Sequence, residues 1–332
     1  MKIDEGRVVE EIRRVKPRLV LLSCPEGYLR QVGDLASRLE REFGVETMVS
    51  ADLCYGVCDT ADLDALKLGA DLAFHIGHRS GFTRIGERTV MVDVFDDADF
   101  SKVIEKAVAL LKPYRRLGLC TISQHLHSLD SAKGLLESAG FEVYVGKGHE
   151  RLLDGQVMGC RFTTSFSIRG EVDALVFLGQ SRFHAVGVAL SSGKSTFMLD
   201  PYSETVEDMG VQAEQWGKRT VLQIYKAVDA KRFGVIVGLR DGQMLSAQAV
   251  HLKKRFQKHG REARLITLRE VTEERLAPFR DLDAFIQTAC PRISIDGSVF
   301  SRPVLSTPQA EALFGIWEGK ELSAFLERPS WV

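Results

Sequence analysis

Residues 18–23, Arg18-Leu-Val-Leu-Leu-Ser23, begin the pattern that decides the fold. A short apolar run of this kind is typical of a buried strand in a parallel sheet. Apolar residues then recur at helical spacing over 29–43, and Gly44 follows as a C-terminal cap. Strand and helix continue to alternate along the next residues, with a strand expected over 45–50, a helix over 60–68 and a strand over 71–76.

The same order of elements recurs twice more along the chain. The second round has strands at 117–122, 141–145 and 172–178 with a helix at 129–139, and the third has strands at 233–238, 263–268 and 283–287 with a helix at 246–258. An aspartate opens the last strand named in each round: Asp71, Asp173 and Asp283. Repeats of this length are domains, because solenoid units run only about 20 to 50 residues.

The sequence therefore predicts an α/β protein. We expect three similar small α/β domains with mainly parallel sheets, arranged around a central site. Helices expected over 101–111 and 206–227 would close the first two domains, so the boundaries are placed at 1–113, 114–228 and 229–332.

Composition excludes several classes of function. The chain has 332 residues, 45% of them apolar and 27% charged, with a formal net charge of −1. Such a balance gives no electrostatic footprint for nucleic acid or membrane. Residues 1–16 are charged and helix-like, and no apolar run approaches the roughly 18 residues of a membrane span. We expect a cytoplasmic protein that binds neither nucleic acid nor membrane.

One cysteine stands in a loop at a strand end in each predicted domain: Cys58, Cys160 and Cys290. Six cysteines at irregular spacing in a reducing compartment indicate free, catalytic or metal-bound thiols rather than disulfides. Cys54 and Cys58 begin the Cys-x3-Cys-x2-Cys pattern of ordinary radical S-adenosylmethionine enzymes, but no third thiol follows. Metal ligands for Cys58 must then come from the other two domains.

Three thiolates from separate domains can bind zinc, bind an iron–sulfur cluster, or bind nothing. Structural zinc normally takes four ligands, mostly from close Cys-x2-Cys pairs, and this chain has none. Three cysteines with one open position suit a [4Fe-4S] cluster that leaves one iron for a substrate. Cys24 and Cys120 lie in or beside buried strands and are expected in the core, whereas the role of Cys54 stays open.

Polar side chains at strand ends form a second set of candidates. We expect them at the same edge as the cysteines, as residues that bind a cofactor: Gln124, His125, Arg182, His184, Arg292 and Asp296. Arginine can hold a carboxylate in a two-pronged contact, so Arg182 or Arg292 would suit an amino-acid carboxylate. Gly193-Lys-Ser-Thr196 resembles the end of a P-loop, but the spacing is wrong and a strand follows it, so nucleotide hydrolysis is excluded.

Seven segments together resemble one family over nearly the whole chain and in the same order, the archaeal diphthamide-biosynthesis 2-(3-amino-3-carboxypropyl)histidine synthases. They are Asp52-Leu-Cys-Tyr-Gly-Val-Cys-Asp59, Leu68-Gly-Ala-Asp-Leu-Ala-Phe-His-Ile-Gly-His78, Gln124-His-Leu-His127, Gly155-Gln-Val-Met-Gly-Cys160, Arg182-Phe-His184, Asp200-Pro-Tyr-Ser203 and Ala289-Cys-Pro-Arg-Ile-Ser-Ile-Asp296. Two positions depart from the family: Cys54 stands where Thr or a small residue is common, and Arg79 stands where Ser is usual.

The resemblance implies that Cys58, Cys160 and Cys290 hold a [4Fe-4S] cluster, which binds S-adenosylmethionine. It also implies that the 3-amino-3-carboxypropyl group is transferred as a radical to C2 of a histidine imidazole of translation elongation factor 2, leaving methylthioadenosine. This chemistry needs no catalytic acid or base beyond the cluster. The resemblance further implies a homodimer and an electron donor, which the sequence does not identify.

Two other functions stay open on the residues alone. The chain could be a zinc-stabilised binding or scaffold protein, or a catalytically inactive homologue that assists an active partner. The metal content of anaerobically purified protein separates the three cases.

Overall fold

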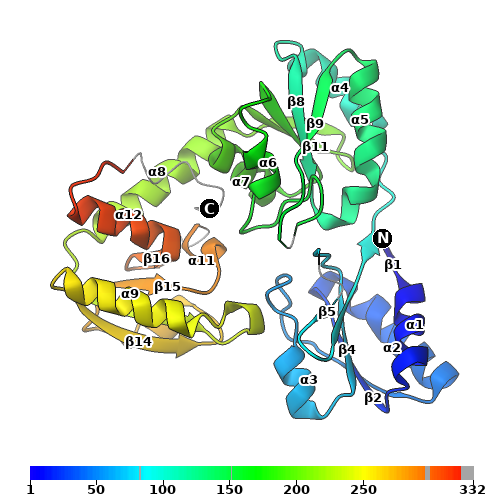
Figure 1. The fold of residues 1–332 in the computed structure, drawn as a ribbon, viewed down its shortest axis with the longest axis horizontal. Coiled ribbons are helices and arrows are strands. Elements are labelled where there is room, and N and C mark those ends of the chain that lie inside the picture. The colour runs from blue at the N-terminus through cyan, green and yellow to red at the C-terminus, as the bar shows by residue number, and fades with distance from the viewer. Residues whose placement is uncertain (82–83, 151, 296–299, 323–332) are drawn as a thin grey trace.

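The computed structural model describes residues 1–81, 84–150, 152–295 and 300–322, and it contains three mainly parallel sheets with helices packed on them. Each sheet draws its strands from one third of the chain. Figure 1 shows the three units at the corners of a triangle, in blue to cyan, green, and yellow to red. The predicted α/β class with mainly parallel sheets is confirmed.

The first sheet has the strand order β3-β2-β4-β6-β5, and all its pairs are parallel except β5 with β6. Its strands are β2 (Leu19–Ser23), β3 (Glu46–Val49), β4 (Leu72–Ile76), β5 (Arg84–Ile85) and β6 (Thr89–Val92). Its helices are α1 (Glu5–Val15), η1 (Glu26–Tyr28), α2 (Leu29–Phe43) and α3 (Asp62–Leu68). A separate short ribbon pairs β1 (Lys2–Ile3) with β7 (Val94–Phe95).

The second sheet has the order β12-β11-β10-β8-β9, with an antiparallel strand, β12, at its edge. Its strands are β8 (Arg116–Thr121), β9 (Glu142–Val145), β10 (Ala174–Leu178), β11 (Thr196–Asp200) and β12 (Thr205–Asp208). The helices nearby are α4 (Ser101–Leu111), η2 (Ser123–Ser128), α5 (Leu129–Ser138), α6 (Thr163–Ser167), α7 (Arg182–Ser192) and α8 (Gly210–Lys226).

The third sheet has the order β14-β13-β15-β16 and is parallel throughout. Its strands are β13 (Arg232–Gly238), β14 (Glu262–Leu268), β15 (Ala284–Gln287) and β16 (Val304–Ser306). The helices are η3 (Asp241–Gln243), α9 (Ser246–Lys258), α10 (Glu273–Leu276), α11 (Pro291–Ile295) and α12 (Thr307–Trp317).

The repeated aspartates have the same structural role in all three units. One carboxylate oxygen of each accepts two consecutive backbone N–H groups at the start of a neighbouring parallel strand: β2, β8 or β13. Asp71 accepts from Arg18 and Leu19 at 2.7 and 3.1 Å, Asp173 from Arg115 and Arg116 at 3.1 and 2.8 Å, and Asp283 from Lys231 and Arg232 at 3.0 and 2.9 Å. The repeated sequence phrase therefore fixes the register of two neighbouring parallel strands.

Two expectations about local structure were wrong. Residues 205–208 form strand β12 along β11, so the helix expected over 206–227 begins only at Gly210. Arg182 and His184 were expected at the end of a strand with no helix after it, but they open helix α7. Gly193 ends this helix with φ of 67°, and β11 follows, so the P-loop-like segment is a helix cap before a strand.

The packing of helices α4 and α8 can be compared with the predicted domain boundaries. Helix α4 lies in the second core, where Val103, Ile104 and Leu111 pack with residues of β8 and β10. This favours a first boundary before Ser101 rather than at residue 113. Helix α8 contacts α7 on one side and α12 on the other, so it links the second and third units (Figure 1). The boundaries at 113 and 228 stay predictions.

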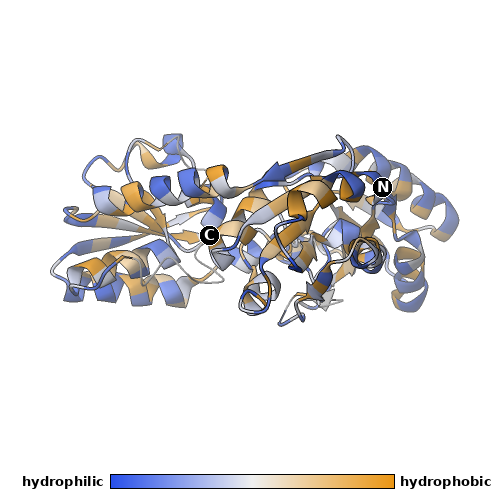
Figure 2. Cartoon of the chain, turned by 90° about the horizontal axis from the view of Figure 1, so that it is seen from above, coloured by the Kyte–Doolittle hydropathy of each residue, from blue (hydrophilic) through white to orange (hydrophobic). Residues whose placement is uncertain are grey.

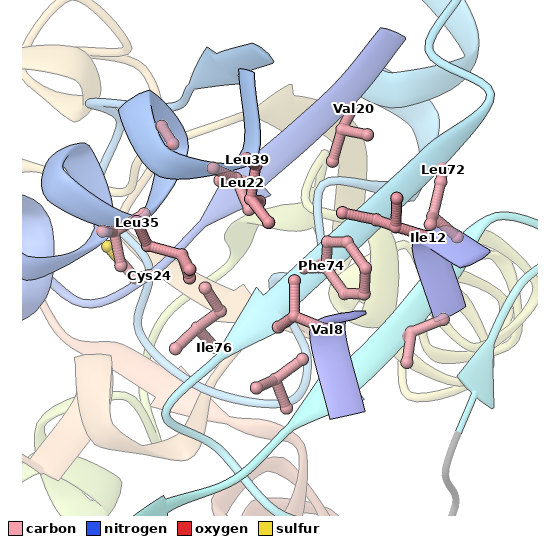
Figure 3. Packing of buried hydrophobic residues seen from close by; sticks show 14 of the residues in the cluster. Val8, Ile12, Val20, Leu22, Cys24, Leu35, Leu39, Leu72, Phe74 and Ile76 are labelled. Carbon is pink, nitrogen blue, oxygen red and sulfur yellow. The ribbon is translucent and has the colours of Figure 1, made fainter. Parts of the chain in front are cut away.

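Figure 2, which colours the backbone by hydropathy, shows the strands mainly in the hydrophobic colour and helices that carry both hydrophobic and hydrophilic segments. Among the described residues, no helix is long and apolar enough to cross a membrane. In the first core, Val8 and Ile12 of α1 pack with Phe74 of β4, all at most 2% exposed (Figure 3). Helix α2 adds Leu35 and Leu39 to the same core (Figure 3).

Phe74→Ala is expected to lower the free energy of unfolding by about 3–5 kcal/mol, because Phe74 is fully buried and its removal leaves a cavity. Leu66→Ala is the control, since Leu66 is 54% exposed, and its effect should stay within about 0.5 kcal/mol. Urea titration followed by circular dichroism measures both. Equal losses in the two variants would contradict the packing described here.

Candidate metal centre and cofactor site

A turn of the third unit holds the loop that carries Cys58. The backbone N–H of Gly242 donates to the carbonyl of Cys58 at 2.8 Å. A Cβ on Gly242 would lie 2.6 Å from Cys58 Cα, so only glycine allows this approach. Asp241 accepts from the Thr60 hydroxyl at 3.3 Å and from the Leu63 N–H at 3.1 Å. The Cys58 loop is therefore fixed from outside its own unit.

Arg240 strengthens the same contact with a buried charge. The residue is 5% exposed, and its guanidinium pairs with Asp59 and donates to the Leu53 carbonyl at 2.9 Å. It also reaches Glu270 at 3.1 Å and lies 4.9 Å from the centre of the Tyr55 ring. Burial raises the pKa of Asp59, and the charge of Arg240 opposes that rise. Loss of Arg240 would leave Asp59 largely buried without its counter-charge, whereas loss of Asp59 would leave Arg240 with only the more exposed Glu270.

Cys290 lies directly after β15, where its loop is held by Gln287. The Gln287 side chain donates to the Cys290 carbonyl at 2.7 Å and accepts from the Ala289 N–H at 2.9 Å. Burial raises the pKa of Cys290, and the charge of a Cys58 thiolate raises it further. The thiols of the first and third units are thus close enough to interact electrostatically.

The Phe183 ring lies between the Cys160 loop of the second unit and Arg292 of the third unit. Met158 and Arg161 pair across a tight turn that contains Cys160. Its neighbour Gly159 packs on the Phe183 ring, which leaves no room for a Cβ. The guanidinium of Arg292 stacks over the same ring at 4.5 Å. Arg292 follows Cys290 by two residues, so the second and third cysteine loops approach one another here.

His184 lies at the same meeting point. Its Nδ1 is 2.6 Å from the Ser181 hydroxyl. Burial lowers the pKa of His184 to about 4, and the charges of Arg292 and His78 lower it as well. Groups from all three units, His78, His184 and Arg292, therefore face one polar region beside the cysteine loops.

The other predicted cofactor residues have contacts of their own. Arg182 forms an exposed two-pronged ion pair with Glu207 at 2.8 and 2.7 Å. Gln124 donates to the Gly77 carbonyl at 2.8 Å, which joins the first and second units. His125 is buried edge-on against Phe100. Asp296 lies outside the described residues.

The core cysteines are where the sequence predicts. Cys24 and Cys120 are at most 1% exposed, and burial raises their pKa to about 11 and about 12. None of the six cysteines is in a disulfide. Cys58, Cys160 and Cys290 are all partly exposed, as residues that receive a ligand must be.

A buried Cys–His–His group beside the Cys58 loop was not predicted as a unit. The sulfur of Cys54 is 3.8 Å from His75 Nδ1 and 4.0 Å from His78 Nδ1. The two rings are joined by a hydrogen bond of 2.9 Å between His75 Nε2 and His78 Nδ1. That bond uses a nitrogen of each ring, so the two histidines already contact one another as well as Cys54. The signal in the sequence was His-x2-His at the end of β4.

Comparison with known proteins places the chain. A family model described as putative diphthamide synthesis protein matches residues 24–323. The chain belongs to the diphthamide synthesis family.

The 2-(3-amino-3-carboxypropyl)histidine synthase of Pyrococcus horikoshii is 34% identical, over 99% of this chain and 95% of that protein. Subunit 1 of the Schizosaccharomyces pombe synthase is 31% identical, over 95% of this chain and 74% of that protein. The crystal structure of Dph2 from Pyrococcus horikoshii with a 4Fe-4S cluster superposes with a TM-score of 0.88, over 99% of this chain and 94% of that one, at 33% identity. The diphthamide synthesis family thus accounts for all three units and their arrangement.

We expect the free energy of unfolding of this protein to decrease as the pH is lowered below neutral. Burial lowers the pKa of His75 to about 3, far under the ordinary 6.5 of an unfolded chain. Between pH 6.5 and about pH 3 the unfolded chain binds a proton at His75 that the folded chain does not bind. The contribution of His75 to the free energy of unfolding is therefore fully present above pH 6.5 and decreases as the pH falls. At pH 5 this decrease should be roughly 2 kcal/mol. Urea titrations of metal-free protein at pH 8 and pH 5 measure this loss.

His75→Asn should reduce that pH dependence by about the same roughly 2 kcal/mol, since the variant has no ring to protonate. The control His149→Gln removes an exposed histidine and should leave the dependence as in the wild type. An unchanged pH dependence in His75→Asn would contradict a buried neutral ring.

Proposed function

We propose that this chain is a 2-(3-amino-3-carboxypropyl)histidine synthase, a transferase of diphthamide biosynthesis. It moves the 3-amino-3-carboxypropyl group of S-adenosylmethionine to C2 of a histidine imidazole on translation elongation factor 2, with methylthioadenosine as the second product. The observation that carries this proposal is the meeting of three cysteine loops, one from each unit, beside a polar region. The synthase name and activity of the relatives support it.

The donor set suits a [4Fe-4S] cluster held by Cys58, Cys160 and Cys290. Two features support the approach of the three loops. The Phe183 ring lies between Gly159 and Arg292. The charge of a Cys58 thiolate also contributes to the raised pKa of Cys290. Three thiolates leave one iron open for the cofactor. A relative with a fold this similar carries such a cluster. When bound, the cluster would supply the electron that splits a carbon–sulfur bond of S-adenosylmethionine.

The protein's own task is to hold the amino-acid end of the cofactor. Arg292 supplies a positive charge in the polar region. Its guanidinium lies over the Phe183 ring, and a guanidinium oriented in this way can donate two hydrogen bonds to a carboxylate. His184 is neutral at physiological pH, so its ring can hydrogen-bond a substrate without repelling Arg292. We propose Arg292 and His184 as the cofactor residues because they lie beside the cysteine loops, whereas Arg182 pairs with Glu207 at the exposed surface.

The remaining assignments follow from this reaction. The acceptor is a protein, so the site must open to a macromolecular surface, and a cytoplasmic location fits an elongation factor as acceptor. We propose a homodimer and an external electron donor on the resemblance given above. The zinc scaffold and the inactive helper are less well supported, because the relatives are named as synthases over nearly the full chain.

Replacement of any one of the three cysteines by alanine is expected to remove most of the bound iron and all transfer activity, because a cluster with only two protein ligands dissociates more easily. The variants are Cys58→Ala, Cys160→Ala and Cys290→Ala. Cys120→Ala is the control in the core, and Cys54→Ala should also keep its iron because its sulfur already contacts His75 and His78. Iron analysis of anaerobically reconstituted protein measures this. Full iron in any of the first three variants would refute the ligand set.

Arg292→Ala should lower methylthioadenosine formation about tenfold or more with dithionite as reductant, while iron content stays as in the wild type. A charge-assisted hydrogen bond is worth about 1.5–3 kcal/mol, and 1.4 kcal/mol is tenfold in rate. Arg182→Ala should cost much less, since its ion pair lies on the surface. Chromatography measures the amount of methylthioadenosine formed by each variant. If 5′-deoxyadenosine were the main nucleoside product, the proposed reaction would be contradicted.

A further inference from the structure

The side chain of Gln243 reaches a cysteine sulfur of another unit. Its Nε2 donates a hydrogen bond to Cys58 Sγ at 3.4 Å. The residue is 5% exposed and stands at the end of η3, in the turn whose Gly242 binds the Cys58 carbonyl. The sulfur therefore comes from the first unit and its donor from the third.

Backbone contacts fix the position of this donor. The Gln243 N–H donates to the Arg240 carbonyl at 2.9 Å, and the Gln243 carbonyl accepts from the Leu245 N–H at 2.9 Å. The turn itself is anchored by the Arg240–Asp59 ion pair. A donor held this firmly acts as a fixed dipole with its positive end on the sulfur.

A hydrogen bond to a ligand sulfur changes the redox behaviour of an iron–sulfur cluster. The reduced cluster carries one more negative charge than the oxidised one, so a positive dipole stabilises the reduced form more. Burial strengthens the effect, because water screens the dipole less. Removing such a donor should make the cluster harder to reduce.

We propose that Gln243 is a positioning residue that holds the Cys58 thiolate and raises the reduction potential of the cluster through its side-chain amide. The inference rests on the proposed function, because it requires Cys58 to be a cluster ligand. In the redox step one electron passes from dithionite to the cluster, whose charge falls from 2+ to 1+. No bond forms or breaks, and both amide protons stay on Gln243.

Two variants test the role of the amide. Gln243→Met keeps an unbranched side chain of similar length without a donor, and Gln243→Glu keeps the shape but replaces the donor with an acceptor. Each is reconstituted anaerobically, its iron is counted, and the cluster is titrated with dithionite at defined potentials while the reduced form is followed by electron paramagnetic resonance. We expect about a tenfold lower ratio of reduced to oxidised cluster at a fixed potential in Gln243→Met, equivalent to about 59 mV for one electron. Gln243→Glu should shift at least as far in the same direction.

Thr60→Val is the matched control. The Thr60 hydroxyl donates to Asp241 in the same turn, and valine has the same shape without the hydroxyl. This variant loosens the contact between the two units but changes neither charge nor the bond to sulfur. Its potential should equal that of the wild type. An equal shift in Thr60→Val would show that the interface as a whole, and not the amide, sets the potential.

Failure of this inference is distinguishable from failure of the proposed function. A wild type that does not bind about four iron atoms per chain contradicts the function itself. Loaded Gln243 variants with the wild-type potential overturn only the role of Gln243. Loss of iron from both Gln243 variants, with iron kept in Thr60→Val, would also overturn the tuning role, since Gln243 would then be needed for assembly instead.

Discussion

The contact between the Gly242 turn and the Cys58 loop is the interaction on which the site depends. A single small α/β unit offers one cysteine loop, and a three-thiolate site requires three such loops to be held together. The backbone bond from Gly242 to Cys58 and the buried Arg240–Asp59 pair join the first unit to the third. Buried charge pairs contribute little net stability over apolar contacts, but they strongly disfavour arrangements that leave a charge unpaired. Arg240 therefore selects one docking arrangement of the two units.

The repeated units explain the scaffold better than they explain the site. Asp71, Asp173 and Asp283 make the same two backbone contacts, so each repeat specifies the pairing of two neighbouring parallel strands within its own unit. The cysteines do not share this equivalence. Cys58 lies between β3 and α3 and Cys160 between β9 and α6, whereas Cys290 follows β15, a later strand of its sheet. The positions of the three cysteine loops thus depend on how the units pack and not on strict threefold repetition.

Much of the fold could be predicted because its signals are local. The apolar spacing and glycine cap of α2 gave both ends of that helix correctly, 29 and 43. Helix α7 was missed because it is buried on most sides, so no polar face interrupts its apolar residues, and its first residues read as the end of a strand. Strand β12 was taken for part of a helix because its pairing partner, β11, decides its state. Tertiary contacts override local preference at such positions.

The residue types of the candidate site could be named from the sequence, but their contacts could not. Cys58 contributes to the raised pKa of Cys290 and Arg292 to the lowered pKa of His184. Arg182 pairs with Glu207, a partner that no motif near Arg182 indicates. Gln243 and Arg240 carried no motif at all, because their function is to contact a loop almost two hundred residues earlier in the chain. Residues of this kind become visible only when the partner loop is in place.

Burial of the thiols has a consequence for how the centre is assembled. It raises the pKa of Cys58 and of Cys290, and the charge of a Cys58 thiolate raises the pKa of Cys290 further. Burial therefore favours the neutral thiol at both positions, which lets the first and third cysteine loops approach without repulsion. Metal ions bind thiolates, so binding releases the thiol protons. The free energy needed to remove these protons therefore reduces the net free energy of metal binding. Gln243 and Arg240 lower the pKa of Cys58 from the opposite side, which makes the first unit's thiol easier to ionise than its burial alone would allow. The turn that docks the third unit thus also prepares the cysteine it holds for its ligand.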